Sequence, residues 1–169
     1  KNGKKKGWVC AKRKYHADDI AVAQSYLMLY QKYKQPEMLL PVLLRADSII
    51  ANPSVVPIDI KVKDPEGKMR WHWCDALIMA PPVYCVLSNI TRDNKYVDFM
   101  DREYRLTTDS LYDKSARLYF RDSRYKSKTE ANGAKVFWAR GNAWVYAGLA
   151  MLLQEMPASY PSYAYYKNL

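Results

Sequence analysis

The side chain best placed for acid–base chemistry is that of Asp75, which follows Trp71 and Trp73 and precedes the apolar run 76–80. A carboxyl group beside aromatic rings holds its proton to a higher pH than one in water. Indole faces are also surfaces on which sugar rings stack. A second interpretation stays open, because Asp is a common N-cap residue and the apolar run predicts a helix that starts here. Asp75 is therefore either an acid in a carbohydrate cleft or a helix cap.

Two further stretches place charged side chains at the starts of apolar runs. Asp18 and Asp19 follow His16 and precede the run 20–30, and Arg140 leads into a second apolar run near the C-terminus. His16 and His72, together with the carboxylates of Asp18, Asp19 and Asp75, have the donor types of a metal site, but their spacing matches no established ligand pattern. We therefore expect no metal and no cofactor.

Apolar residues at helical spacing predict five helices, joined by short turns and one long loop. These helices cover 20–30, about 37–50, 75–87, 95–106 and 140–153. Pro81 and Pro82 must kink the third helix or delay its start, and Pro41 suits the second helix only in its first turn. A small hairpin is expected over 111–125, and a short edge strand over 55–62. The fold class is therefore all-α.

The helices also form a weak internal repeat. Each repeat consists of an apolar helix, a short turn, a more amphipathic helix and a loop, in that order. The first repeat begins at Asp18, the second at Asp75 and the third at Arg140. Buried helices that alternate with half-buried ones describe a toroid of helical hairpins. The inner helices of such a toroid run parallel, so these three side chains converge on one cleft. Helix N-termini there favour an anionic ligand.

The net charge of +10 is unevenly distributed. Seven Lys and Arg residues lie in the first fourteen positions, without an acidic residue among them. We therefore predict a basic flexible lead-in over 1–14, a helical domain over 15–157 and a tail rich in Tyr and Pro over 158–169. A basic run is usually solvated, so we expect no nucleic-acid partner, although a nucleic-acid binder remains a rival interpretation.

The three cysteines, Cys10, Cys74 and Cys85, have no metal-ligand spacing and do not indicate a disulfide framework. The longest apolar stretch, 76–87, is too short for a membrane span, so we expect no membrane partner. No secretory signal is recognisable, but the chain does not begin with Met. Localisation therefore stays open between the periplasm and the cytoplasm of a bacterium.

At these stretches the sequence resembles glycoside hydrolase families 88 and 105, the unsaturated glucuronyl and rhamnogalacturonyl hydrolases. The matching pieces are His16-Ala-Asp18-Asp19 running into Gln24-Ser-Tyr26, then Trp73-Cys-Asp75-Ala-Leu-Ile-Met-Ala-Pro-Pro82, and Trp138-Ala-Arg-Gly-Asn-Ala-Trp144. The resemblance covers nearly all of residues 8–157 and is strongest for the rhamnogalacturonyl group. It implies an (α/α)6 barrel, a toroid of six helical hairpins.

The resemblance also implies roles for individual residues. Asp75 is expected to be the general acid and base, with Asp18 as a second acidic residue beside it and Asp19 as a weaker match for that role. The residues expected to bind substrate are Arg140, Trp144, Trp73, Trp138, Asp19 and His16, the last by contacting sugar hydroxyls or by orienting Asp18. For Arg140 the alternative is a structural ion pair, and for Trp144 it is core packing.

The sequence departs from the family pattern in three respects. Many relatives carry a His where this chain has Tyr119-Phe-Arg-Asp122-Ser-Arg124, and Ala143 stands at a position that is commonly Gly. A full barrel also needs roughly twice this chain. We therefore expect about half of the barrel here, completed by further helices or by self-association.

The implied reaction removes a 4,5-unsaturated galacturonyl residue from the non-reducing end of pectin (rhamnogalacturonan) oligosaccharides. It proceeds by hydration of the vinyl ether, with Asp75 as the acid and base. The alternative is an inactive or non-catalytic carbohydrate-binding fragment of such a hydrolase. The sequence does not distinguish a galacto- from a gluco-configured uronate, nor does it name the sugar that follows.

Overall fold

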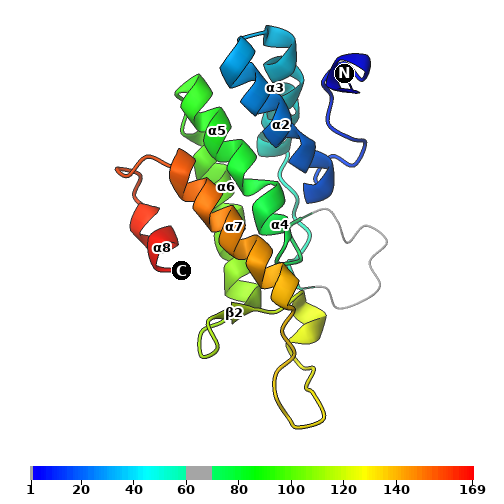
Figure 1. Cartoon of the computed structure of the whole chain (residues 1–169), viewed down its shortest axis with the longest axis vertical. Coiled ribbons are helices and arrows are strands. Elements are labelled where there is room, and N and C mark those ends of the chain that lie inside the picture. Colours follow the sequence, from blue (N-terminus) through cyan, green and yellow to red (C-terminus); the bar gives the residue numbers. More distant parts are fainter. Residues whose placement is uncertain (1, 60–69) are drawn as a thin grey trace.

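The computed structural model describes residues 2–59 and 70–169, and most of them are helical (Figure 1). This confirms the all-α class. The elements are α1 (Asn2–Lys5), α2 (Ala17–Tyr33), α3 (Pro36–Ala51), α4 (Ala76–Met79), α5 (Pro81–Thr91), α6 (Lys95–Leu111), β1 (Tyr112–Asp113), β2 (Leu118–Tyr119), the 3-10 turn η1 (Ser123–Tyr125), α7 (Ala139–Glu155) and α8 (Tyr163–Asn168).

The helices pack as three consecutive antiparallel pairs. α2 contacts α3, α5 contacts α6, and α7 contacts α8, while α2 and α7 each also pack against α4 and α5. α2, α4–α5 and α7 run in the same direction, with their first residues toward the lower end of the molecule (Figure 1). The predicted parallel inner helices are therefore present, and they bring Asp18, Asp75 and Arg140 to the same end.

The predicted third helix is interrupted at its two prolines, as their missing N–H groups require. Pro82 cannot donate to the carbonyl of Ile78, and the carbonyls of Ile78 and Met79 instead accept hydrogen bonds from Gln24 Nε2, at 2.6 and 2.7 Å. A side chain of α2 thus replaces the hydrogen bonds that α4 loses where it meets α5. This arrangement fixes the start of the α4–α5 unit, including Asp75, against α2.

α7 lies so close to α4 that only glycine fits at their contact. A Cβ atom at Gly148 would stand 2.7 Å from the carbonyl oxygen of Leu77 and 2.8 Å from Cα of Ile78. One at Gly141 would stand 2.7 Å from Sγ of Cys74. The first turn of α7 therefore packs directly against the segment that carries Asp75.

The expected hairpin is present but short, with Tyr112 paired to Tyr119 in β1 and β2. Asn142 joins it to α7: its Oδ1 accepts from the backbone N–H of Tyr119 at 2.7 Å, and its Nδ2 donates to the carbonyl of Tyr119 at 3.0 Å. The chain that leaves β2 is therefore held beside the start of α7.

Three local expectations need correction or completion. Pro41 lies inside α3 and beyond its first turn, because the helix already begins at Pro36. Residues 55–59 form no strand, and the rest of the expected edge strand, 60–62, lies outside the described residues. The C-terminal tail contains α8, whose Tyr166 is buried and donates to Asp101 at 2.6 Å.

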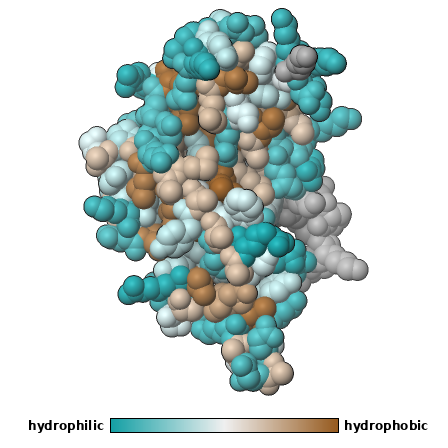
Figure 2. Space-filling view, in the orientation of Figure 1, coloured by the Kyte–Doolittle hydropathy of each residue, from teal (hydrophilic) through white to brown (hydrophobic). Residues whose placement is uncertain are grey.

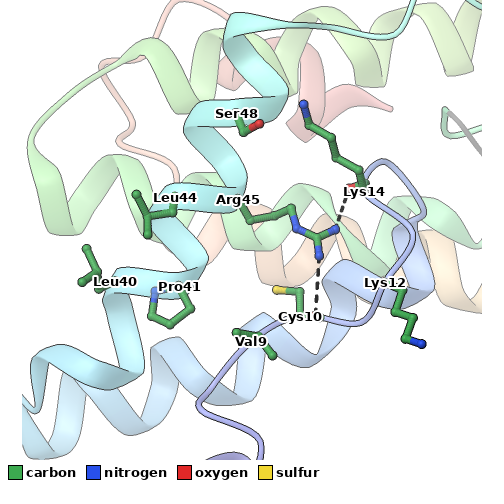
Figure 3. A pocket seen from close by; sticks show the side chains of 9 residues that line it. All are labelled: Val9, Cys10, Lys12, Lys14, Leu40, Pro41, Leu44, Arg45 and Ser48. Atoms are coloured by element: carbon green, nitrogen blue, oxygen red, sulfur yellow. Dashed lines mark hydrogen bonds between the residues drawn. The ribbon is translucent and has the colours of Figure 1, made fainter.

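The second half of the basic lead-in packs on the helices. Trp8 makes an edge contact with Tyr26, and the Arg45 guanidinium donates to the carbonyls of Cys10 and Lys14 (Figure 3). A groove of about 540 Å³ remains between this segment and α3. Its lining residues are Val9, Cys10, Lys12, Lys14, Leu40, Pro41, Leu44, Arg45 and Ser48. The division of the chain into lead-in, domain and tail stays a prediction.

Candidate active site

Asp75 occupies the N-cap position of α4, but its side chain does not cap the helix. Its backbone is already helical, with φ −72° and ψ −12°, and the carboxylate makes no capping hydrogen bond. Within the described part of the chain, its buried Oδ1 atom has no hydrogen-bond partner at all. The carboxyl group is thus left available for a ligand, which favours the acid over the helix cap.

The surroundings of Asp75 raise its pKa above the ordinary value for Asp. Burial is the main cause, since it disfavours the charged form, and the nearby Asp18 carboxylate acts in the same direction. The backbone N–H of Asp75 and the positive charges of Arg121 and Arg140 oppose the shift without cancelling it. Asp18, Arg121 and Arg140 are therefore the charges that a ligand at Asp75 would meet.

His16 connects the start of α2 to this site. It is the N-cap residue of α2, where its Nδ1 accepts from the backbone N–H of Asp18 at 3.1 Å. Its ring is 1% exposed and lies 5.2 Å from the ring of Trp73, measured between centroids. This burial favours orientation of Asp18 over direct contact with a sugar. The Asp18 side chain itself is 49% exposed.

Asp19 has a different role from its neighbour. Its carboxylate is buried, accepts from the backbone N–H of Arg13 at 2.8 Å and forms an ion pair with the Arg13 guanidinium. The Arg13 hydrogen bonds hold the pKa of Asp19 below its ordinary value. The carboxylate is thus engaged within the protein, and its proposed contact with substrate stays a prediction.

The two tryptophans before Asp75 separate in the fold. Trp71 is buried in the core, with its ring centroid 6.1 Å from that of Tyr84 and 6.3 Å from that of Phe99. Trp73 is only half-buried, against His16. Trp71 is therefore a core residue, and its expected place beside Asp75 stays a prediction.

Arg121 is the site residue that the sequence analysis missed. Its backbone carbonyl accepts from the N–H of Cys74 at 2.9 Å, and the next residue, Asp122, forms a β-bridge with Trp73. The chain after β2 therefore runs beside the segment that carries Asp75. No periodic pattern encodes this pairing, since its partners are far apart in sequence. The available signal was Arg121 itself, in the stretch that was expected to depart from the family pattern.

Two guanidinium groups lie over the ring of Trp138. The group of Arg140 is 4.8 Å from the ring centroid, and that of Arg121 is 5.9 Å from it. Arg140 takes part in no ion pair within residues 2–59 and 70–169, so the alternative of a structural ion pair has no support there. Trp144 follows one turn later on α7 and is 44% exposed, which argues against core packing.

The residues of the alternative metal site do not assemble in the described part of the chain, where no three His, Cys, Asp or Glu side chains form a cluster. His72, the other histidine of that alternative, is buried with its Nδ1 3.1 Å from the carbonyl oxygen of Ile58.

None of the described helices is both long and apolar enough to cross a membrane.

Comparison with known proteins identifies the family of the chain. The family model for Glycosyl Hydrolase Family 88 matches residues 1–169. Two proteins named unsaturated 3S-rhamnoglycuronyl hydrolase are similar in sequence. The protein from Alteromonas sp. (strain LOR) is 37% identical over an alignment of 159 residues that covers 89% of this chain. That from Formosa agariphila is 39% identical over an alignment of 171 residues that covers 96% of this chain. The chain spans only 38% and 45% of their lengths.

Solved structures share the fold. One titled a polysaccharide lyase superposes with a TM-score of 0.84 at 26% identity, over 98% of this chain and 48% of that one. A glycosyl hydrolase family 88 protein from Bacteroides vulgatus gives 0.82 at 22% identity, over 98% and 49%. A family 105 glycoside hydrolase from C. acetobutylicum gives 0.70 at 16% identity, over 94% and 45%. The paired helices thus form part of an α/α toroid, and the chain belongs to glycosyl hydrolase family 88.

Proposed function

We propose that the protein containing this chain is a glycoside hydrolase that removes a 4,5-unsaturated uronyl residue from the non-reducing end of an oligosaccharide. The observation that carries the proposal is the half-buried carboxyl group of Asp75, which does not cap its helix and has a raised pKa, beside Asp18, Arg121 and Arg140. Family membership supports the reaction class.

The proposed next sugar is rhamnose, as in rhamnogalacturonan oligosaccharides from pectin. The names of both curated relatives, which contain "rhamnoglycuronyl", support this choice. The double bond removes the stereocentre at C4 that distinguishes galacturonate from glucuronate. The unsaturated residue therefore differs between the two sources only in its anomeric linkage, and specificity must come from that linkage and from the next sugar.

In the proposed mechanism, Asp75 begins protonated and donates its proton to C4 of the vinyl ether. The cation that forms at C5 is stabilised by the ring oxygen, and water adds to C5 while its proton passes to the Asp75 carboxylate. The resulting hemiketal opens and releases the next sugar. The carboxylate of Asp18 helps to keep Asp75 protonated before the reaction and favours the positive charge at C5 during it.

Arg140 is proposed to hold the substrate carboxylate, because a guanidinium donates two parallel hydrogen bonds to such a group. Trp144, Trp138 and Trp73 offer indole faces along the proposed cleft. Their exposed or half-buried positions support this role.

The test is ultraviolet absorbance during incubation with an unsaturated galacturonyl-rhamnose disaccharide, since hydration removes the conjugated double bond. We expect the absorbance to fall, and Asp75→Asn to slow the fall by about 100-fold or more, the usual contribution of a general acid and base. If Asp75→Asn keeps the full rate, Asp75 is not the general acid and base.

The same measurement separates two alternatives. Eliminative cleavage, the reaction of polysaccharide lyases, creates such a double bond, so absorbance would rise on an intact polysaccharide. A carbohydrate-binding fragment without activity would change the absorbance of neither the disaccharide nor the polysaccharide. The disaccharide would still quench its tryptophan fluorescence. A fall in absorbance is expected only from the hydrolase.

A further inference from the structure

Asn142 lies on α7 between two residues that are proposed to bind the substrate. Arg140 and Trp144 are four positions apart, so they share one face of the helix. Asn142 is two positions from each and therefore lies on the opposite face. It is half-buried, whereas Arg140 and Trp144 are exposed. Asn142 thus faces the protein while its two neighbours face the proposed ligand.

The side-chain amide of Asn142 is fully engaged with the backbone. Its Oδ1 accepts from the N–H of Tyr119 at 2.7 Å. Its Nδ2 donates to the carbonyl of Tyr119 at 3.0 Å and to that of Trp138 at 3.1 Å. Two hydrogen bonds exchanged with a single residue are the pattern of a neighbouring strand in an antiparallel sheet. The amide therefore attaches the β1–β2 hairpin to α7 as a third strand would.

The chain that follows Tyr119 also supports the segment that carries Asp75. Two residues later, the carbonyl of Arg121 accepts from the N–H of Cys74 at 2.9 Å. Residues 119–121 are therefore held at one end by α7 and at the other by the residue before Asp75. A displacement of Tyr119 from α7 would shift Arg121 relative to Asp75.

The two cations that act on Asp75 lie on either side of this attachment. Arg121 belongs to the attached segment, and Arg140 lies two positions before Asn142 on α7. Both positive charges lower the pKa of Asp75, whereas burial and the Asp18 carboxylate raise it. The placement of the two guanidinium groups therefore affects how readily Asp75 holds its proton.

We propose that Asn142 is a positioning residue, which fixes Arg121 and Arg140 relative to Asp75 without contacting the substrate. This inference rests on the proposed function. Removing the amide would free the segment after Tyr119 to move away from α7, and the two guanidinium groups would then lose their fixed places beside the acid.

The test compares Asn142→Ala with Asn89→Ala. Asn89 is the matched control, because it is also half-buried and its Nδ2 donates to the carbonyl of Glu155 at 2.6 Å. That bond attaches α5 to the last turn of α7, at the opposite end from the site. The close contact of Gly148 with α4 involves neither amide, so both variants are expected to fold.

We expect Asn142→Ala to raise KM for the unsaturated galacturonyl-rhamnose disaccharide by about 10-fold, the usual effect of a lost charge-assisted hydrogen bond, and to leave kcat within about threefold. The falling limb of kcat/KM against pH should move to higher pH, because both cations that lower the pKa of Asp75 are loosened. A merely structural residue would change only the amount of folded protein, which lowers the apparent kcat and leaves KM and the limb in place. Asn89→Ala should behave in that way.

Asn142→Ser separates the attachment from the helix itself. Its hydroxyl can still donate to the carbonyl of Trp138, four residues earlier, but it is too short to reach Tyr119. It should therefore change KM and the limb as Asn142→Ala does, and it replaces that variant if circular dichroism shows that Asn142→Ala is unfolded.

An unchanged KM and limb in the folded variants of Asn142 would overturn the proposal, and so would equal changes in Asn89→Ala. If no protein removes the absorbance of the disaccharide, the hydrolase proposal fails by itself. The inference is then decided by disaccharide affinities measured by tryptophan fluorescence, which should weaken by about 10-fold in Asn142→Ala and stay unchanged in Asn89→Ala. Equal affinities, or no binding to the unaltered protein, would overturn it.

Discussion

The carboxyl groups of Asp75 and Asp19 lie in the same region, but their pKa values are shifted in opposite directions. Burial and the Asp18 carboxylate raise the pKa of Asp75, and hydrogen bonds from Arg13 lower the pKa of Asp19. The first group therefore retains a proton that it can donate, and the second is held as an anion. The sequence predicted the position of Asp75 from its aromatic neighbours, but it did not distinguish the roles of adjacent Asp18 and Asp19, which depend on Arg13.

The pH dependence of activity should report these charges. Since Asp75 must start protonated, kcat/KM should fall as pH rises through its pKa. Asp18→Asn removes a charge that raises this pKa, so the falling limb should move to lower pH. Arg121→Gln removes a charge that lowers it, so the limb should move to higher pH. The measurement is kcat/KM against pH, and limbs that coincide in all three proteins would disprove the assignment.

Stability should change in opposite directions for the two carboxyl groups. The folded chain binds a proton at Asp75 more tightly than the unfolded chain, so stability falls as pH rises from the ordinary value of 3.8 to the raised pKa. Asp75→Asn should therefore melt at a higher temperature than the unaltered protein at pH 7, with the gain fading near pH 4.

Asp19→Asn is the matched control for this effect. The lowered pKa of Asp19 contributes stability that is present above 3.8 and is lost as pH falls through the folded pKa. This variant should melt at a lower temperature at pH 7, with the difference shrinking in acid. A lower melting temperature for both variants at pH 7 would contradict the account of Asp75. Thermal melts followed by circular dichroism at the two pH values are sufficient.

At the scale of elements, the helices were predictable, but the contacts that position them were not. The periodicity of apolar residues predicted five helices, and Pro81 and Pro82 predicted the break between α4 and α5. Sequence spacing could not show that Gln24 would bond across that break, or that Asn142 would join β2 to α7. Both contacts link residues from separate elements, and such pairings follow from packing and not from local preference.

The role of Gln24 can be measured directly. Gln24→Ala leaves the carbonyls of Ile78 and Met79 without their partner, so we expect a loss of about 1–3 kcal/mol in the free energy of unfolding. Gln31→Ala, an exposed residue of the same type on the same helix, should stay within about 0.5 kcal/mol. Urea denaturation compares the two, and equal effects would show that the hydrogen bonds of Gln24 do not stabilise the break.

At the scale of the molecule, the resemblance predicted a partial toroid, and the parallel start of α2, α4 and α7 agrees with it. Hydrophobic residues cross the middle of the face on which α7 lies (Figure 2). The most exposed large apolar side chain of α7 is Tyr146, at 80%. We propose that this face is covered by self-association when the chain is present alone. The pattern of apolar residues did not reveal it, since helical spacing counts buried and exposed apolar positions alike.

Self-association predicts a concentration-dependent mass. Sedimentation equilibrium should give about twice the monomer mass of 19.7 kDa at high concentration. Tyr146→Glu, which places a charge on the exposed face, should shift the equilibrium toward the monomer. Val55→Glu is the control, because this residue is 91% exposed and lies outside the helices. A monomer at all concentrations would rule the contact out.

The close contact of Gly141 with Cys74 has a practical consequence. Cys74 is 0% exposed, and burial raises the pKa of its thiol to about 12, so an alkylating reagent can react with it only after the first turn of α7 has moved away. The rate of alkylation at this one position therefore reports how often the neighbourhood of Asp75 opens to solvent. Peptide mapping by mass spectrometry distinguishes alkylation of Cys74 from alkylation of Cys10 and Cys85. Slower alkylation of Cys74 in the presence of a saccharide would show that the bound saccharide reduces this opening, and the measurement requires no enzymatic turnover.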